Sequence, residues 1–323
     1  MDRDTAARIV EGDMPYLGFS THWRVVGDLE SGKPPLVLLH GGPGSTRNYF
    51  EVLDCLADTG RAVVSYDQLG CGDSFVDGRP ELWYAQTWVD ELVALREHLG
   101  LDRIHLLGQS WGGMLAITYL ADERPAGIAS AVLSSTLPAS WLWARENRRM
   151  ARQLPAEQAE ALLAPAQVVE RARAGARAAS CDPDLAARRA MVAYDDPAYQ
   201  AALNTYMQMH CNDVTPGPDA PECVRRPKRG GRECYVTAWG PDELTPTGTL
   251  ASWDYIDRLP SIDVPALVIS RTDDLSTPLV SKTIADGLPN ARWELIAGAR
   301  HSCFINAHDQ YCELLASWMA EHD

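Results

Sequence analysis

The sequence predicts an α/β protein, with a mostly parallel central sheet flanked by helices and a helical insertion that interrupts it. Short apolar runs alternate with helical patterns through the first 135 residues, and this alternation resumes after Trp253. The runs are continuously apolar, which is typical of strands covered on both faces. Strands separated by helices at this spacing form βαβ units, so the sheet is expected to be parallel.

Six runs have the composition of buried strands. They are Leu36–Leu39, Ala62–Tyr66, Ile104–Leu107, Ala131–Leu133, Ala266–Ser270 and Trp293–Ile296. Thr87–Leu99 carries apolar residues at the helical period and is followed by Gly100, a common stop signal. His308–Ala320 has the pattern of an amphipathic helix.

The stretch between the fourth and fifth predicted strands differs in composition. Three segments rich in Ala, Arg and Glu predict helices broken by prolines, namely Trp141–Leu154, Ala156–Ala164 and Gln167–Ala179. A proline-rich loop with the basic run Arg225–Arg232 follows them. We therefore expect a core domain at residues 1–136 and 248–323 and an inserted helical domain at residues 137–247, called the cap below.

The 323-residue chain has a formal net charge of −15 and enough length for one large domain. This acidity argues against nucleic acid as a partner, because phosphate binding needs clustered Lys and Arg, and against an anionic membrane surface. No run approaches the roughly 20 apolar residues of a membrane span, and the first residues lack the apolar stretch of a secretory signal. The expected compartment is the cytoplasm, and no oligomeric state follows from the sequence.

No metal or other cofactor is expected, because His, Cys and acidic residues show no spacing typical of a metal site. In a reducing compartment most cysteines are expected to be free thiols. The eight cysteines are Cys55, Cys71, Cys181, Cys211, Cys223, Cys234, Cys303 and Cys312. A local disulfide among Cys211, Cys223 and Cys234, which share one loop-rich stretch, stays open.

Gly108-Gln109-Ser110-Trp111-Gly112 matches the G-x-S-x-G pattern of a catalytic serine. The motif lies directly after a predicted strand and directly before an apolar helical run, which is the context it requires. Such a strand-to-helix turn tolerates only small flanking residues, and it presents the serine hydroxyl at a helix N-terminus. Ser110 is therefore the predicted nucleophile.

His40-Gly41-Gly42-Pro43-Gly44 follows the first predicted strand. A glycine-rich turn lets backbone N–H groups approach a substrate oxygen without interference from a Cβ atom. We expect an oxyanion hole formed by the N–H groups of Gly42 and Trp111, with Gly41 as the alternative to Gly42. His40 is expected to be structural, and a phosphate loop is disfavoured because no Lys-Ser or Lys-Thr pair follows.

The other members of a catalytic triad are expected later in the chain, the acid before the histidine. Asp273 and Asp274 follow the strand Ala266–Ser270, and the spacing to Pro278 favours Asp274 as the acid. His301 lies on the loop after the next strand and is the predicted general base. The carboxylate would hold the imidazole in the tautomer that accepts the serine proton.

Together these motifs resemble those of the proline iminopeptidase family of α/β-hydrolases, closest to the branch of the tricorn-interacting aminopeptidase and the L-proline amide hydrolases. The resemblance rests on HGGPG at 40–44, YDQLGCGDS at 66–74, GQSWGG at 108–113 and WGPDELTPTGTL at 239–250. It implies an α/β-hydrolase fold with a cap. It also implies cleavage of an amide bond next to a free α-amino group, in a small molecule or short peptide.

In this family, acidic cap residues hold the substrate ammonium group. The resemblance assigns Glu243 to this role, because it matches the glutamate of the family's N-G-P-N-E-F-like motif. A second acid is expected after the segment Tyr206–His210, where this sequence departs from the family. Asp213 and Glu222 are the candidates there.

Trp239, together with Trp141 and Trp143, is expected to line the substrate pocket. Two further departures from the family lie beside the triad: Arg271 stands where glycine is usual, and Ala299–Arg300 precede the histidine. An arginine near the mouth of the pocket would favour a substrate with a carboxylate or phosphate, or it would pair with the acidic surface.

The predicted reaction is acyl transfer to water through an acyl-enzyme on Ser110. An esterase, thioesterase or lactonase is the alternative, because the triad alone does not select the leaving group. A binding protein of the same fold without activity is the third interpretation, and the intact motifs argue against it.

Overall fold

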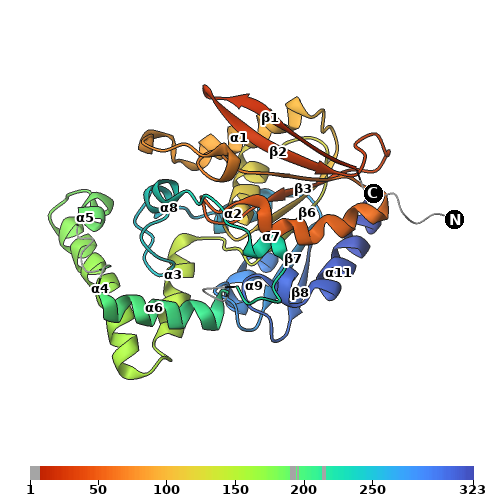
Figure 1. Ribbon diagram of the computed structural model, residues 1–323. Helices are drawn as coiled ribbons and strands as arrows, with labels where there is room; N and C mark the ends of the chain where they lie inside the picture. The colour runs from red at the N-terminus through yellow and green to blue at the C-terminus, as the bar shows by residue number, and fades with distance from the viewer. Residues whose placement is uncertain (1–7, 190–193, 195, 213–215) are drawn as a thin grey trace.

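The computed structural model describes residues 8–189, 194, 196–212 and 216–323. Its centre is an eight-stranded sheet in the order β1-β2-β4-β3-β5-β6-β7-β8 (Figure 1). β2 pairs antiparallel with β1 and with β4, and all other neighbours are parallel. The strands are β1 (Ile9–Tyr16), β2 (Phe19–Val26), β3 (Leu36–Leu39), β4 (Val63–Tyr66), β5 (Ile104–Gln109), β6 (Ile128–Ser134), β7 (Ala266–Arg271) and β8 (Ala291–Ile296).

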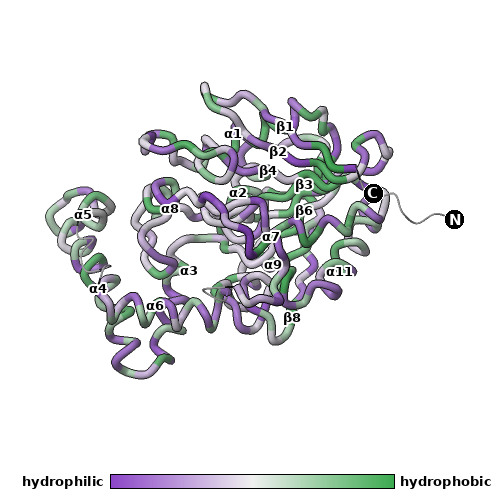
Figure 2. The backbone as a smooth tube through the Cα atoms, viewed as in Figure 1, coloured by the Kyte–Doolittle hydropathy of each residue, from purple (hydrophilic) through white to green (hydrophobic). Residues whose placement is uncertain are grey.

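Helices cover both faces of the sheet because its central strands are apolar on both sides. Val37 and Leu39 of β3 belong to one hydrophobic cluster, and Leu36 and Leu38 belong to the other. The first cluster includes residues of α1 (Ala85–His98), α2 (Trp111–Thr118) and α9 (Pro278–Gly287). The second includes residues of η1 (Arg47–Thr59), α10 (Cys303–Asn306) and α11 (His308–Glu321). Figure 2 shows the most hydrophobic segments gathered in the central strands.

The six predicted strands and the two predicted helices of the core are all present, and β3 coincides with its prediction. The hairpin formed by β1 and β2 was not predicted. β1 lies at the edge of the sheet and carries few buried residues, so it lacks the continuous apolar run that marks the inner strands. Four short helices complete the core: η2 (Gly72–Ser74), η3 (Pro80–Leu82), η4 (Tyr119–Glu123) and η5 (Ile256–Ser261).

The described elements between β6 and β7 are all helical; η5 belongs to the core, and Figure 1 shows those of the cap beside one end of the sheet. They are α3 (Ser140–Ala151), α4 (Ala156–Ala178), α5 (Pro183–Arg189), α6 (Pro197–His210), α7 (Glu222–Arg225) and α8 (Arg232–Ala238). The predicted break at Pro165 is wrong, because α4 continues through it. Pro165 is buried, so the packing of α4 outweighs the one hydrogen bond that proline cannot donate.

All eight cysteines are free, so the disulfide left open among Cys211, Cys223 and Cys234 is not formed. Within the described residues, no helix has the length and apolar character to cross a bilayer.

Candidate active site

The turn between β5 and α2 holds Ser110 in a strained conformation, with φ 56° and ψ −121°. Both glycines of the motif are needed for close backbone contacts. A Cβ on Gly108 would lie 2.2 Å from the carbonyl oxygen of Gly112, and one on Gly112 would lie 1.9 Å from that of Leu39. The spacing of G-x-S-x-G is therefore a packing requirement of a nucleophile elbow.

Asp274 and His301 come together from the loops after β7 and β8. His301 Nδ1 lies 2.6 Å from Asp274 Oδ1, and both side chains are buried. Ser110 and His301 line the same cavity. Asp273, the alternative acid, contacts this region through its backbone, where its carbonyl oxygen lies 3.2 Å from His210 Nδ1. The structure thus brings Asp274, and not Asp273, to the histidine.

Both oxygens of the Asp274 carboxylate accept further hydrogen bonds. Oδ1 accepts from the Ser276 N–H at 2.9 Å, whereas Oδ2 accepts from the Ser135 hydroxyl and, at 3.2 Å, from Arg271. Burial alone would raise the pKa of Asp274, but His301, Arg271 and Ser135 together hold it below its ordinary value. The acid is therefore ionised when the histidine needs a partner for its Nδ1 proton.

The turn after β3 distinguishes the amides of Gly41 and Gly42 as donors to a substrate oxygen. The Gly41 N–H donates to the Tyr49 hydroxyl at 2.6 Å, and that hydroxyl donates to Gln109 Oε1 at 2.8 Å. The Gly42 N–H donates to no group among the described residues. Gly42 is therefore the better placed oxyanion donor, together with Trp111 at the N-terminus of α2.

His40 stabilises this turn through contacts of both its ring nitrogens. Its Nε2 accepts from the Gln68 N–H at 3.0 Å, and its Nδ1 lies 2.9 Å from the carbonyl oxygen of Gly41. The ring is fully buried, and this burial lowers the pKa of His40. Both ring nitrogens are occupied, which agrees with a structural role.

A cavity of about 660 Å³ lies over Ser110 and is walled by the core and the cap. Glu243, on the cap loop after α8, lines this cavity. Its Oε1 accepts a hydrogen bond from the Tyr235 hydroxyl at 2.7 Å. Burial raises the pKa of Glu243 above its ordinary value, and a cation beside the carboxylate would favour its charged form.

Comparison with known proteins decides the family. Residues 34–307 match the family described as the alpha/beta hydrolase fold. A proline iminopeptidase of Clostridium botulinum is 48% identical over 316 residues, which cover 98% of this chain and 100% of that protein. The chain belongs to the proline iminopeptidase family of α/β-hydrolases.

Two solved structures agree with this membership. A proline iminopeptidase of Mycobacterium smegmatis has a TM-score of 0.76 and 29% identity, covering 97% of this chain and 98% of that one. The structure of VinJ has a TM-score of 0.80 and 31% identity, covering 97% and 99%. As a member of the proline iminopeptidase family, the chain is a serine hydrolase.

Three expectations about the pocket of this family member are corrected. Glu222 is outside the cavity lining, because its largely exposed carboxylate pairs with Arg226 at 2.6 Å. Trp239 is also outside the lining; it is buried edge-on against Trp143, and its Nε1 donates to the carbonyl oxygen of Asp242. Trp141 and Trp143 do not line the cavity either. Asp213 lies outside the described residues.

The two arginines beside the triad behave differently. Arg300 lines the cavity, and its Nη1 donates to the Gln208 carbonyl oxygen at 2.7 Å. Arg271 is far from the mouth: it is completely buried and donates to Asp274 Oδ2, to the His301 carbonyl oxygen and to Ser134 Oγ. Arg271 therefore pairs with the predicted acid and lies outside the cavity lining.

Sequence reasoning missed Tyr49, Ser135 and Tyr235. Ser135 follows directly after β6, so its position at the carboxyl end of a neighbouring parallel strand could have indicated proximity to Asp274. Tyr49 and Tyr235 belong to no recognisable motif. Their contacts with Gly41 and Glu243 arise only in the folded chain, so the sequence does not predict them.

Arg271→Met is expected to destabilise the protein by about 3–5 kcal/mol at neutral pH, because it removes one partner of a buried ion pair. The depressed pKa of Asp274 contributes stability above the ordinary aspartate pKa of about 4, and this contribution is lost as the pH falls through the folded-state pKa. The substitution raises that pKa, so the electrostatic part of the loss is largest at neutral pH. Urea unfolding of both proteins at several pH values measures it; a difference that grows with acidification would contradict this assignment.

Proposed function

We propose that this hydrolase cleaves the bond after an N-terminal residue with a free amino group, and that proline is the residue it prefers. The observation that carries the proposal is the carboxylate of Glu243 in the same cavity as Ser110 and His301. A carboxylate in such a site favours a cationic partner, since burying an unpaired charge is costly. The substrate ammonium group is that partner. The identity of 48% to a proline iminopeptidase supports proline as the N-terminal residue.

The proposed reaction begins when Ser110 Oγ attacks the substrate carbonyl carbon while His301 Nε2 takes its proton. Asp274 holds the Nδ1 proton of His301 and stabilises the imidazolium. The N–H groups of Gly42 and Trp111 stabilise the oxyanion. His301 then protonates the leaving amine. Water next attacks the acyl-enzyme while His301 takes its proton, and His301 returns this proton to Ser110 Oγ as the acid product leaves.

The cavity suits a short peptide. Its volume of about 660 Å³ is within the range of roughly 300–1,000 Å³ found for small-molecule sites. Lys228, Arg232 and Arg300 also line it, and their charges would favour the carboxylate end of a di- or tripeptide.

Three substrates separate the proposal from its alternatives. L-prolyl p-nitroanilide tests the proposed activity, N-acetyl-L-prolyl p-nitroanilide tests the need for a free amine, and p-nitrophenyl acetate tests simple esterase activity. We expect efficient hydrolysis of the first and little hydrolysis of the second. Faster turnover of the acetylated compound, or esterase activity alone, would overturn the proposal.

Glu243→Gln is expected to reduce kcat/KM for L-prolyl p-nitroanilide about 10- to 100-fold, because it removes a charged hydrogen bond worth about 1.5–3 kcal/mol. Activity on p-nitrophenyl acetate should change little, since that substrate has no amine. Glu222→Gln is the matched control, because Glu222 lies outside the cavity lining. Equal losses on both substrates in Glu243→Gln would indicate general damage to the site and not loss of amine binding.

A further inference from the structure

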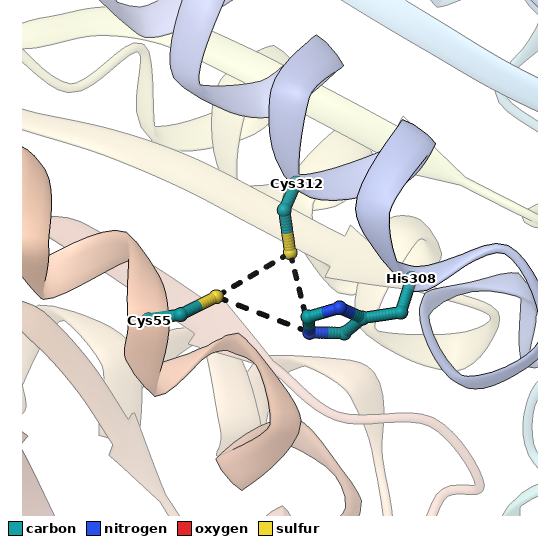
Figure 3. A group of neighbouring side chains, drawn as sticks. All are labelled: Cys55, His308 and Cys312. Atoms are coloured by element: carbon teal, nitrogen blue, oxygen red, sulfur yellow. Dashed lines mark hydrogen bonds between the residues drawn. The ribbon is translucent and has the colours of Figure 1, made fainter.

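Three metal-ligating side chains that the proposed function does not use converge on the side of the sheet covered by η1 and α11. Cys55 projects from η1, whereas His308 and Cys312 project from the first turns of α11, and Figure 3 shows all three pointing toward one another. The two cysteines are 257 residues apart in the sequence. None of the three lines the cavity over Ser110.

The three ligand atoms have the separations of a tetrahedral zinc site. The two Sγ atoms are 3.6 Å apart, and His308 Nε2 lies 3.5 Å from Cys312 Sγ and 3.9 Å from Cys55 Sγ. Zinc bonds of about 2.3 Å to sulfur and 2.0–2.1 Å to nitrogen, at tetrahedral angles, give edges of about 3.8 Å between two sulfurs and about 3.6 Å between sulfur and nitrogen. The cluster therefore needs only a few tenths of an ångström of adjustment to enclose the ion.

The surroundings also fit a metal ligand set. His308 and Cys312 are four residues apart on a helix, so they share one face of α11. Nδ1 of His308 lies 3.0 Å from Oδ1 of Asp309. Such a carboxylate commonly orients a zinc-bound imidazole from the second coordination shell.

We propose that Cys55, His308 and Cys312 form a surface zinc-binding site, with a water molecule as the fourth ligand. Two thiolates and one imidazole are the donor set that Zn²⁺ favours over the hard cations Mg²⁺ and Ca²⁺. Cys55 is exposed, so solvent can reach the fourth position. Bound zinc would tie η1 to α11 and stabilise the packing between them.

Binding requires a defined exchange of bonds. In the structure His308 Nε2 lies 2.8 Å from the carbonyl oxygen of Val52, and this contact is given up when Nε2 coordinates the ion. The imidazole proton then resides on Nδ1, where it is donated to Asp309. The two thiols each lose a proton to solvent, so binding one Zn²⁺ to the two thiols and the neutral imidazole releases two protons.

A second group of potential ligands is already engaged in hydrogen bonds within the protein. The ligand atoms of His40, Asp67 and Cys71 also lie within 4.8 Å of one another, but all three residues are buried. The Asp67 carboxylate accepts the backbone N–H groups of Arg47 and Asp73, and His40 Nε2 accepts that of Gln68. These atoms are committed to the turn after β3. Among the described residues, the thiols of Cys55 and Cys312 have polar contacts only with each other, with His308 and, for Cys55, with the Val52 carbonyl.

The test uses the untagged full-length enzyme, reduced and freed of metal with a chelator. Titration with Co²⁺ is expected to produce the visible bands of a tetrahedral site and a thiolate-to-cobalt charge-transfer band in the near ultraviolet, saturating at one ion per chain. Zn²⁺ should displace Co²⁺, and zinc analysis after dialysis should find one equivalent. A raised midpoint of thermal unfolding should accompany binding, because zinc binds the folded state.

Variants decide whether these residues hold the ion. Cys55→Ser/Cys312→Ser should lose the charge-transfer band and the retained zinc, while circular dichroism shows an intact fold. Cys181→Ser, at an exposed cysteine elsewhere, should bind as the parent does. Asp309→Asn should weaken zinc binding about tenfold. Persistence of the cobalt spectrum in the double variant, no zinc retained by the parent, or a Cys55–Cys312 disulfide that resists the reductant would each overturn the proposal.

Discussion

Ser110→Ala is expected to lower kcat for L-prolyl p-nitroanilide by about a millionfold, the scale of loss when a triad nucleophile is removed from a serine hydrolase. The fold should be unaffected, because residue 110 is held by its backbone. Its N–H donates to the Ser134 carbonyl oxygen at 3.0 Å, and its carbonyl oxygen accepts from Thr136 at 2.7 Å. Alanine meets the same positive φ as serine, so the strain of the turn is unchanged.

A fluorophosphonate probe measures the nucleophile independently of the substrate. The parent should be labelled at one serine, and Ser110→Ala should not be labelled. Ser317→Ala, at an exposed serine on α11, is the matched control and should retain both labelling and activity. Labelling or substantial turnover by Ser110→Ala would mean that another group is the nucleophile, or that the chain does not use an acyl-enzyme.

The inner sheet could be predicted because each of its strands is buried on both faces. Leu36–Leu39 forms β3 as expected, and its residues alternate between the two hydrophobic clusters. The same physical rule explains what escaped prediction. The edge strand β1 is mostly exposed or half-buried, and the continuation of α4 through Pro165 depends on tertiary packing that local propensity does not encode.

The proposed catalytic residues could be expected to meet because they follow strands whose carboxyl ends lie at one edge of the sheet. What could not be predicted is the set of contacts behind them. An arginine was expected near the mouth, and Arg300 lines the cavity, whereas the register of β7 directs Arg271 inward to Asp274 and Ser134. The cluster of Cys55 and Cys312 was invisible for the same reason: only the packing of η1 against α11 joins them.

Asp274→Asn is expected to reduce kcat about 10⁴-fold, the loss seen when the triad aspartate of a serine protease is replaced by its amide. The asparagine retains the shape of the side chain, but its amide cannot serve the imidazole as a charged acceptor. His301 then loses the partner that orients its ring and stabilises its protonated form. Asp273→Asn is the matched control. Asp273 precedes Asp274 in the chain and touches the site through its backbone, so its replacement should change kcat less than about threefold.

Two losses must be separated in the Asp274→Asn protein, because Arg271 is left as a buried charge without its carboxylate. The unpaired charge of Arg271 lowers stability and therefore the fraction of folded enzyme. The loss of the His301 partner lowers turnover by each folded molecule. Circular dichroism, at a temperature well below the unfolding midpoint, measures the folded fraction. Adding Arg271→Met to Asp274→Asn should recover part of the stability, since the unpaired charge is gone, and none of the turnover. Recovery of kcat in the double variant would show that Asp274 acts on catalysis only by neutralising Arg271, and the triad assignment would fail.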